Sequence, residues 1–231
     1  MTVERPVAIP AGTITLNGDL ARPVGGERIV LFAHGSGSSR HSPRNRYVAS
    51  VLREAGFATL LMDLLTVDEE SLDERTGHLR FDIGLLAERL VSATDWIASE
   101  PASRQLAIGY FGASTGAAAA LVAAAQRADL VRAIVSRGGR PDLASGALPR
   151  VNAPTLLIVG GRDVPVIDMN REAMAQMRGD VELEIVPGAT HLFEEPGTLE
   201  VVARLARDWF ARHLKHSHAA GPRDDSARVG R

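Results

Sequence analysis

Three polar residues that lie far apart in the sequence have the chemistry of a nucleophile, an acid and a base. Ser114 is at the centre of the pentapeptide Gly-Ala-Ser-Thr-Gly (residues 112–116), between an apolar run and an alanine-rich stretch. A G-x-S-x-G sequence between a strand and a helix is typical of a sharp turn that exposes the serine hydroxyl at a helix N-terminus, where backbone N–H groups favour a developing anion. The alternative, a glycine-rich turn with a helix-capping serine, fits the pentapeptide but not its setting.

A serine hydroxyl needs a base that removes its proton, and the base needs an acid that orients it. With the nucleophile first in the chain, the acid and then the histidine are expected in loops after later strands. Asp163 and His191 each lie in a short loop directly after an apolar run. We therefore predict a catalytic triad of Ser114, Asp163 and His191, with Asp168 as the reserve acid. The alternatives are a helix-capping aspartate and a solvent-exposed loop histidine.

Negative charge on a tetrahedral intermediate needs two hydrogen-bond donors that are already in place. The backbone N–H of Thr115, directly after the nucleophile, is the first candidate. The second is the backbone N–H of Ser36 in the sequence His-Gly-Ser-Gly (residues 34–37), which follows a buried apolar run. Glycines on either side of Ser36 allow the backbone to approach a substrate closely. By itself this segment also fits an ordinary glycine turn.

The elements that must position these residues alternate between short apolar runs and helical patterns. We predict eight strands, at residues 3–9, 13–21, 29–33, 58–64, 106–111, 131–136, 155–159 and 181–186. We predict helices at residues 43–55, 82–99, from the pentapeptide to residue 128, 167–177 and 198–213. This order predicts an α/β fold, with an eight-stranded, mostly parallel sheet covered by helices on both faces. Only residues 141–154 separate the sixth and seventh strands, so we expect an open site without a large lid domain.

The series strand-HGSG, strand-GASTG-helix, strand-GGRD and strand-PGATH resembles the α/β-hydrolase superfamily, and most of all its dienelactone-hydrolase-like branch. The resemblance covers residues 3–214, nearly the whole chain. Dienelactone hydrolase proper has a cysteine nucleophile, whereas this chain has Ser114 at that position, so the dienelactone reaction itself is not carried over. Some similar bacterial hydrolases are joined to phosphoribosyltransferase-like domains, and the resemblance therefore implies association with such a protein.

These residues predict a serine hydrolase that cleaves a small ester through an acyl-enzyme on Ser114, with no cofactor. Thioesterase, lactonase and acyltransferase activities use the same triad and stay open. A non-catalytic binding module on this fold is the alternative from another class. The correct chain order of nucleophile, acid and base argues against it.

Arginines gather in two segments that are expected near the mouth of the site. Arg40, Arg44 and Arg46 follow the third predicted strand, and Arg137 follows the sixth, where ligands bind open α/β sheets. Arg80 is a further candidate. Guanidinium groups match carboxylates and phosphates, so these residues predict binding of an anionic substrate group. Ion pairing with the acidic segment at residues 68–74, or simple solvation, is the alternative.

Composition excludes several other classes of function. The 231 residues include no cysteine, which excludes disulfides and thiolate metal sites, and the net charge of −2 gives no reason to expect nucleic-acid or membrane binding. We expect a cytoplasmic protein. His213, His216 and His218 lack neighbouring carboxylates, so we expect no metal site there. Residues 1–214 are expected to form one domain, and the polar, aperiodic residues 215–231 a disordered tail.

Overall fold

The sheet of this protein has the strand order β1-β2-β4-β3-β5-β6-β7-β8 in the computed structural model, which describes residues 2–214. Among the described strands, only β2 runs against the others: it pairs antiparallel with β1 and β4, and all other neighbours are parallel. The strands are β1 (Thr2–Ala11), β2 (Ile14–Pro23), β3 (Arg28–Ala33), β4 (Ala58–Met62), β5 (Ala107–Ala113), β6 (Val131–Arg137), β7 (Thr155–Gly160) and β8 (Val181–Val186). The predicted eight-stranded, mostly parallel sheet is confirmed.

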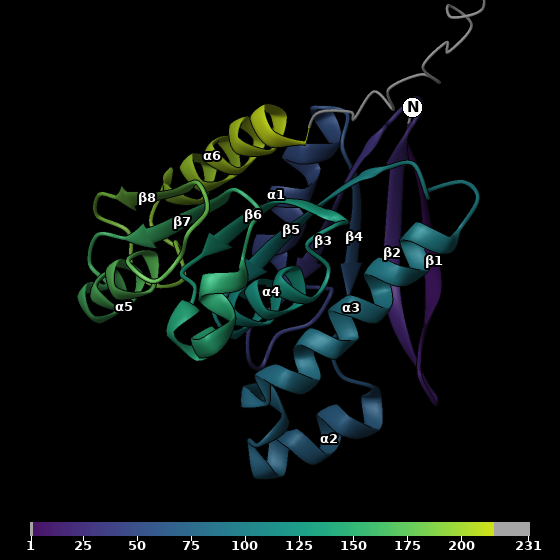
Figure 1. Cartoon of the computed structure of the whole chain (residues 1–231), viewed down its shortest axis with the longest axis horizontal. Helices are drawn as coiled ribbons and strands as arrows, with labels where there is room; N and C mark the ends of the chain where they lie inside the picture. The colour runs from purple at the N-terminus through teal and green to yellow at the C-terminus, as the bar shows by residue number, and fades with distance from the viewer. Residues whose placement is uncertain (1, 215–231) are drawn as a thin grey trace, which may run out of the picture.

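Helices cover both faces of the sheet (Figure 1). On one face lie α1 (Pro43–Glu54) and α6 (Thr198–His213), whose apolar side chains share one core cluster. On the other lie α3 (Ile83–Ser99) and α4 (Thr115–Gln126), which share a second cluster, with α5 (Val164–Met174) beside them. Because β3 and β5 are in the middle of the sheet and are covered on both faces, their sequences are apolar almost throughout.

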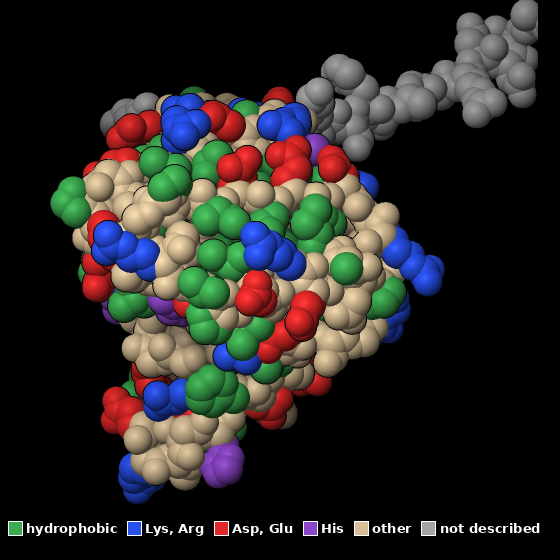
Figure 2. All heavy atoms as spheres, turned by 90° about the vertical axis from the view of Figure 1, so that its left-hand side faces the viewer, with side chains coloured by type: hydrophobic (Ala, Val, Ile, Leu, Met, Phe, Trp, Pro, Cys, Tyr) green, Lys and Arg blue, Asp and Glu red, His purple; other side chains and the backbone are tan. Residues whose placement is uncertain are grey.

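The α2–η1 segment, formed by α2 (Val67–Thr76) and the 3₁₀ helix η1 (Leu79–Phe81), projects from the domain at the bottom of Figures 1 and 2. Hydrophobic periodicity does not predict α2, which contains the acidic segment at residues 68–74. Instead of an apolar face, α2 has a capping box: the Thr66 hydroxyl accepts a hydrogen bond from the Glu69 backbone at 3.2 Å, and the Glu69 carboxylate accepts one from the Thr66 backbone at 2.8 Å.

Most predicted helices are found close to their predicted bounds. Ser42 caps α1 with Pro43 in its first turn, and α6 has the bounds predicted for it. The helix predicted from residue 167 begins earlier, because Asp163 is its N-cap and Pro165 fits its first turn. The connection between β6 and β7 is the short helical segment η2 (Pro141–Arg150), and no large lid domain is present in residues 2–214.

The strand order reverses beside β3, and this reversal positions the site. The chain leaves β3 through α1 on one face of the sheet and returns from β4 to β5 through α3 on the other. Ligands of open α/β sheets bind outside the carboxyl ends of strands at such a reversal. No helix within residues 2–214 is long and apolar enough to cross a membrane. The predicted tail at residues 215–231 lies outside the described part of the chain.

Candidate active site

Ser114 occupies the turn between β5 and α4 with strained backbone angles, φ 50° and ψ −119°. A left-handed φ is costly for serine and persists only where the surroundings hold it. The surroundings here are unusually close: a Cβ on Gly116 would lie 2.3 Å from the Ala33 carbonyl oxygen and 2.4 Å from that of His34. Only glycine lets the first turn of α4 pack this tightly against the end of β3. This geometry fits the predicted nucleophile turn.

Asp163 and His191 lie in the loops after β7 and β8, and the two side chains meet. Nδ1 of His191 is 2.6 Å from Oδ2 of Asp163, whose side chain is 15% exposed. Glu195 also holds the His191 loop in place, because its carboxylate accepts a hydrogen bond from the Thr190 backbone at 3.1 Å. That hydrogen bond lowers the pKa of Glu195 and keeps it charged. Asp168, the reserve acid, is exposed and pairs with Arg171 instead.

The main chain at the end of β6 links the nucleophile to the base. The Arg137 carbonyl accepts a hydrogen bond from the Ser114 backbone at 3.2 Å. The next residue, Gly138, has φ 51°, and a Cβ there would lie 3.5 Å from two atoms of the His191 ring. No hydrogen bond joins the Ser114 and His191 side chains within residues 2–214. Catalytic hydrogen bonds often tighten only when a substrate is bound.

The two residues that were predicted to provide the oxyanion donors are in contact. The hydroxyls of Ser36 and Thr115 are 3.2 Å apart, and neither backbone N–H donates to another described residue. Sequence reasoning noted His34 only as part of the sequence His-Gly-Ser-Gly. In the structure, the His34 side chain holds the loop that contains Ser36. Its Nε2 accepts a hydrogen bond from the Leu64 backbone at 3.1 Å, and its Nδ1 is 3.0 Å from the Gly35 carbonyl oxygen. Burial lowers the pKa of His34, which favours the neutral imidazole that the hydrogen bond from Leu64 requires.

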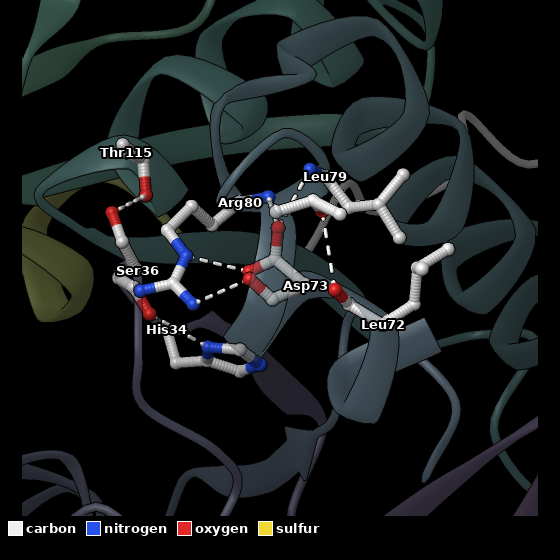
Figure 3. A network of polar contacts seen from close by, with 9 residues as sticks. His34, Ser36, Leu72, Asp73, Leu79, Arg80 and Thr115 are labelled. Atoms are coloured by element: carbon white, nitrogen blue, oxygen red, sulfur yellow. Dashed lines mark hydrogen bonds and ion pairs between the residues drawn. The ribbon is translucent and has the colours of Figure 1, made fainter. Parts of the chain in front are cut away.

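A cavity of about 90 Å³ opens beside these donors, under the α2–η1 segment. Sequence reasoning could not find the contact between α2 and η1 that lines it. The buried carboxylate of Asp73 accepts hydrogen bonds from Arg80 Nε at 2.5 Å and from the Leu79 backbone at 2.7 Å (Figure 3). Burial raises the pKa of Asp73, but hydrogen bonds from Arg80 and Leu79 outweigh burial and lower it overall. Arg80 thus lies fixed between Asp73 and the Ser36–Thr115 pair (Figure 3).

The four arginines that were predicted to bind substrate have different surroundings in the structure. Arg40 forms ion pairs with Asp63 and Asp19, so its charge is already compensated. Arg46 is exposed on α1. Arg44, also on α1, pairs with Glu194 at 3.2 Å. Arg137 is only 6% exposed and stands near Phe193 in the His191 loop.

Arg80, the further candidate, pairs with Asp73 of the acidic segment 68–74, as the alternative expected. Glu69 of the same segment pairs with Arg89, and within residues 2–214 none of the segment's ion pairs involves Arg40, Arg44, Arg46 or Arg137. The described residues contain no cluster of His, Asp or Glu side chains suited to a metal ion.

Comparison with known proteins places the chain in a family. Residues 18–216 match the model of the dienelactone hydrolase family. The crystal structure of dienelactone hydrolase from Anabaena variabilis is 62% identical, superposes with a TM-score of 0.91, and matches over 93% of this chain and 99% of that one. Est1E from Butyrivibrio proteoclasticus is 17% identical, with a TM-score of 0.74 over 90% of this chain and 98% of that one, and so shares the fold.

Two curated proteins from Mycobacterium tuberculosis strains, each named "Putative phosphoribosyl transferase", are 60% identical over 211 residues. The match covers 91% of this chain but 47% of theirs, so the chain spans about half the length of these relatives. The family model covers most of the chain, and the Anabaena protein matches nearly all of it. This chain belongs to the dienelactone hydrolase family.

Proposed function

We propose that this hydrolase is a serine carboxylesterase that forms an acyl-enzyme on Ser114. The 2.6 Å contact between His191 Nδ1 and Asp163 Oδ2 carries the proposal, because it orients the imidazole and leaves Nε2 for the serine. The strained turn at Ser114 and the unpaired backbone N–H groups of Ser36 and Thr115 support it.

The proposed reaction has two steps. In the first, His191 takes the proton of the Ser114 hydroxyl while the serine oxygen attacks the ester carbonyl. The Ser36 and Thr115 N–H groups stabilise the resulting oxyanion. The C–O bond to the alcohol then breaks, and His191 gives its proton to the leaving oxygen. In the second step, water attacks the acyl-enzyme in the same way and releases the acid and free Ser114.

Thioesterase, lactonase and acyltransferase activities would use the same groups and differ in the leaving group or in the acceptor. A binding module that does not catalyse is the alternative of a different kind. Two free oxyanion donors beside an oriented histidine favour catalysis over binding alone, because a binding module needs neither.

Replacement of Ser114 tests the proposal. Ser114→Ala should abolish labelling by a fluorophosphonate probe and lower kcat for phenyl acetate by about 10³-fold or more, while the far-UV circular dichroism spectrum stays unchanged. Ser50→Ala, which removes a hydroxyl that is hydrogen-bonded within α1, is the control. It should keep both the probe labelling and the wild-type kcat for phenyl acetate. Wild-type turnover by a folded Ser114→Ala protein would refute the serine mechanism.

We also propose that this chain associates with a phosphoribosyltransferase-like protein, and that the name of the mycobacterial relatives describes the half that this chain does not match. The support is their length and name, because the matched half resembles a hydrolase. Light scattering on a mixture of this protein and the unmatched half of the relative should detect a complex. Two unchanged separate species at concentrations well above micromolar would refute the association.

A further inference from the structure

Arg137 is a buried cation without an anionic partner. It is the last residue of β6, and its side chain is on the face of the sheet that α1 and α6 cover, as are Ala133 and Val135. Its Nε has no hydrogen-bond partner, and no carboxylate within residues 2–214 pairs with its guanidinium. Burial, together with the nearby charge of Arg44, lowers the pKa of Arg137 to about 10, so the group is still charged at neutral pH. Burying an unpaired charge is unfavourable, and an anion beside it would remove that cost.

The charge that acts on Arg137 is of the same sign, because it belongs to Arg44. Arg44 lies in the first turn of α1, and its own partner, Glu194, has a side chain that is 63% exposed. Exposed ion pairs of this kind contribute little to stability and exchange easily. An incoming carboxylate or phosphate could therefore be held by two guanidinium groups, with Glu194 moving into solvent.

The position of this pair relative to His191 identifies the part of the substrate that it would meet. The guanidinium carbon of Arg137 lies 6.0 Å from the centre of the Phe193 ring, two residues after His191. Gly138, directly after Arg137, packs against the His191 ring. Because His191 protonates the leaving oxygen in the proposed reaction, the alcohol half of the ester must face this side. The acyl half then points away from His191, toward the cavity beside Ser36 and Thr115.

That cavity has the opposite charge. Carboxylates outnumber guanidinium groups among its lining residues, which include Asp63, Glu70, Asp73, Glu74 and Arg80. Asp63 and Asp73 are neutralised by ion pairs, whereas Glu70 and Glu74 have no cationic partner among the described residues. A volume of about 90 Å³ suits a short acyl group, and the two free carboxylates disfavour a negative charge on it.

We propose that the cleft is polarised by charge: it takes a small, uncharged acyl group in the Glu70–Glu74 cavity and a leaving group that carries a carboxylate or a phosphate at Arg137 and Arg44. This inference rests on the proposed ester hydrolysis and adds which half of the ester carries the charge. Recognition is by shared oxyanion chemistry, since guanidinium groups bind both carboxylate and phosphate in bidentate fashion.

Two pairs of esters test where the charge is accepted. The first pair, 3-acetoxybenzoate and 3-acetoxybenzamide, differs in charge on the leaving group. The second, phenyl hydrogen succinate and the phenyl ester of succinamic acid, differs in charge on the acyl group. For the wild-type protein, kcat/KM should favour the charged member of the first pair by about 5- to 100-fold and the neutral member of the second. A third ester, 3-acetoxyphenyl phosphate, distinguishes phosphate from carboxylate as the preferred anion.

Substitutions test which residues cause the preference for a charged leaving group. Arg137→Met keeps the bulk of the side chain without its charge and should bring the charged-to-neutral ratio of the first pair close to one. Arg137→Lys should retain part of the ratio, and Arg44→Gln should lower it. Arg132→Gln is the matched control, because Arg132 is exposed at the opposite end of the same strand, and it should leave the ratio and the basal activity unchanged.

Each result decides the proposal. Ratios near one for both pairs, with neutral esters still hydrolysed, would overturn the charge polarity and leave the esterase proposal intact. An unchanged ratio in folded Arg137→Met would overturn the assignment to Arg137. If that variant does not fold, the wild-type ratios and Arg44→Gln decide instead. Absence of turnover for every ester, together with absence of probe labelling at Ser114, would overturn the proposed function and this inference with it.

Discussion

His34 shows how much a single buried side chain can contribute to a site without contacting a substrate. Its ring accepts a hydrogen bond from Leu64 and faces the Gly35 carbonyl, and so joins the end of β4 to the loop that contains Ser36. A protonated imidazole could not accept the bond from Leu64. We therefore regard His34 as a positioning residue for the Ser36 N–H.

Replacement of His34 by leucine should displace the Ser36 loop and lower kcat for phenyl acetate by about 10- to 100-fold, with little change in KM. Loss of one oxyanion donor affects the transition state more than substrate binding, which is why the two constants should separate. His34→Gln, which can still accept and donate, should recover part of the rate. His78→Leu, at an exposed position, is the control. A rise in KM with kcat unchanged would contradict this role.

At the level of elements, polar contacts hold α2 against η1. Asp73 accepts hydrogen bonds from the Leu79 backbone and from both the backbone and side chain of Arg80. A carboxylate that is held in this way stabilises the fold only while it is charged. Low pH should therefore loosen the packing of α2 against η1.

Asp73→Asn should lower Tm at neutral pH, because the neutral amide loses the ion pair with Arg80. The pKa of Asp73 is lowered in the folded protein, so its contribution is present at all pH values above its ordinary value of 3.8. That contribution is lost as the pH falls through the lower, folded pKa. The Tm difference between wild type and Asp73→Asn should thus be constant from about pH 7 to pH 5 and narrow below pH 4. Asp68→Asn, on the exposed side of α2, is the control and should melt at the same Tm as wild type at each pH. A Tm difference between wild type and Asp73→Asn that grows below pH 4 would contradict this account.

The contact between α4 and β3 gives a prediction about packing. Gly116→Ala should lower the free energy of unfolding by more than about 2 kcal/mol, because the new Cβ would overlap two backbone carbonyl oxygens. Gly146→Ala, with no heavy atom within 4 Å of its added Cβ, should change it by less than about 1 kcal/mol. Urea denaturation of both variants measures the difference. Equal stability of the two would mean that the chain relaxes more easily at Gly116 than this packing implies.

Elements with an apolar pattern or a clear cap were predictable from the sequence. The central strands, the turn at Ser114 and the Ser42-Pro43 start of α1 carry such signals. By contrast, α2 is stabilised by Thr66, Glu69 and the Asp73–Arg80 contact, and the hydrophobic periodicity used for prediction does not detect these. The partners of the arginines were also hidden, since Asp19 and Asp63 approach Arg40 only through the pairing of β2 with β4.

For the molecule as a whole, α6 completes the core cluster that it shares with α1. Trp209 and Phe210 are at most 2% exposed, and Leu214 is fully buried directly after the helix. Residues 215–231 have a polar, aperiodic sequence without an apolar pattern that would add to this core. A chain that ends before Trp209 lacks two large aromatic side chains from its core.

A protein of residues 1–214 should melt within about 2 °C of the full chain, whereas one of residues 1–208 should be unfolded at room temperature. Removal of a buried aromatic side chain costs about 3–5 kcal/mol, and two such losses approach the whole stability of an ordinary domain. Thermal melts followed by circular dichroism compare the three proteins. A large loss of Tm in the 1–214 protein would show that residues 215–231 stabilise the domain.

The tight contact at Gly116 has a consequence for how the enzyme can diversify. The turn at Ser114 is held by main-chain atoms of β3 and α4, so its immediate surroundings tolerate little mutation. The charged groups that we assign to substrate choice are side chains on α1, at the end of β6 and in the α2–η1 segment. Directed evolution that randomises Arg44, Arg137, Glu70 and Glu74 should therefore yield many folded, active variants with new preferences, while libraries at Gly116 should yield almost none.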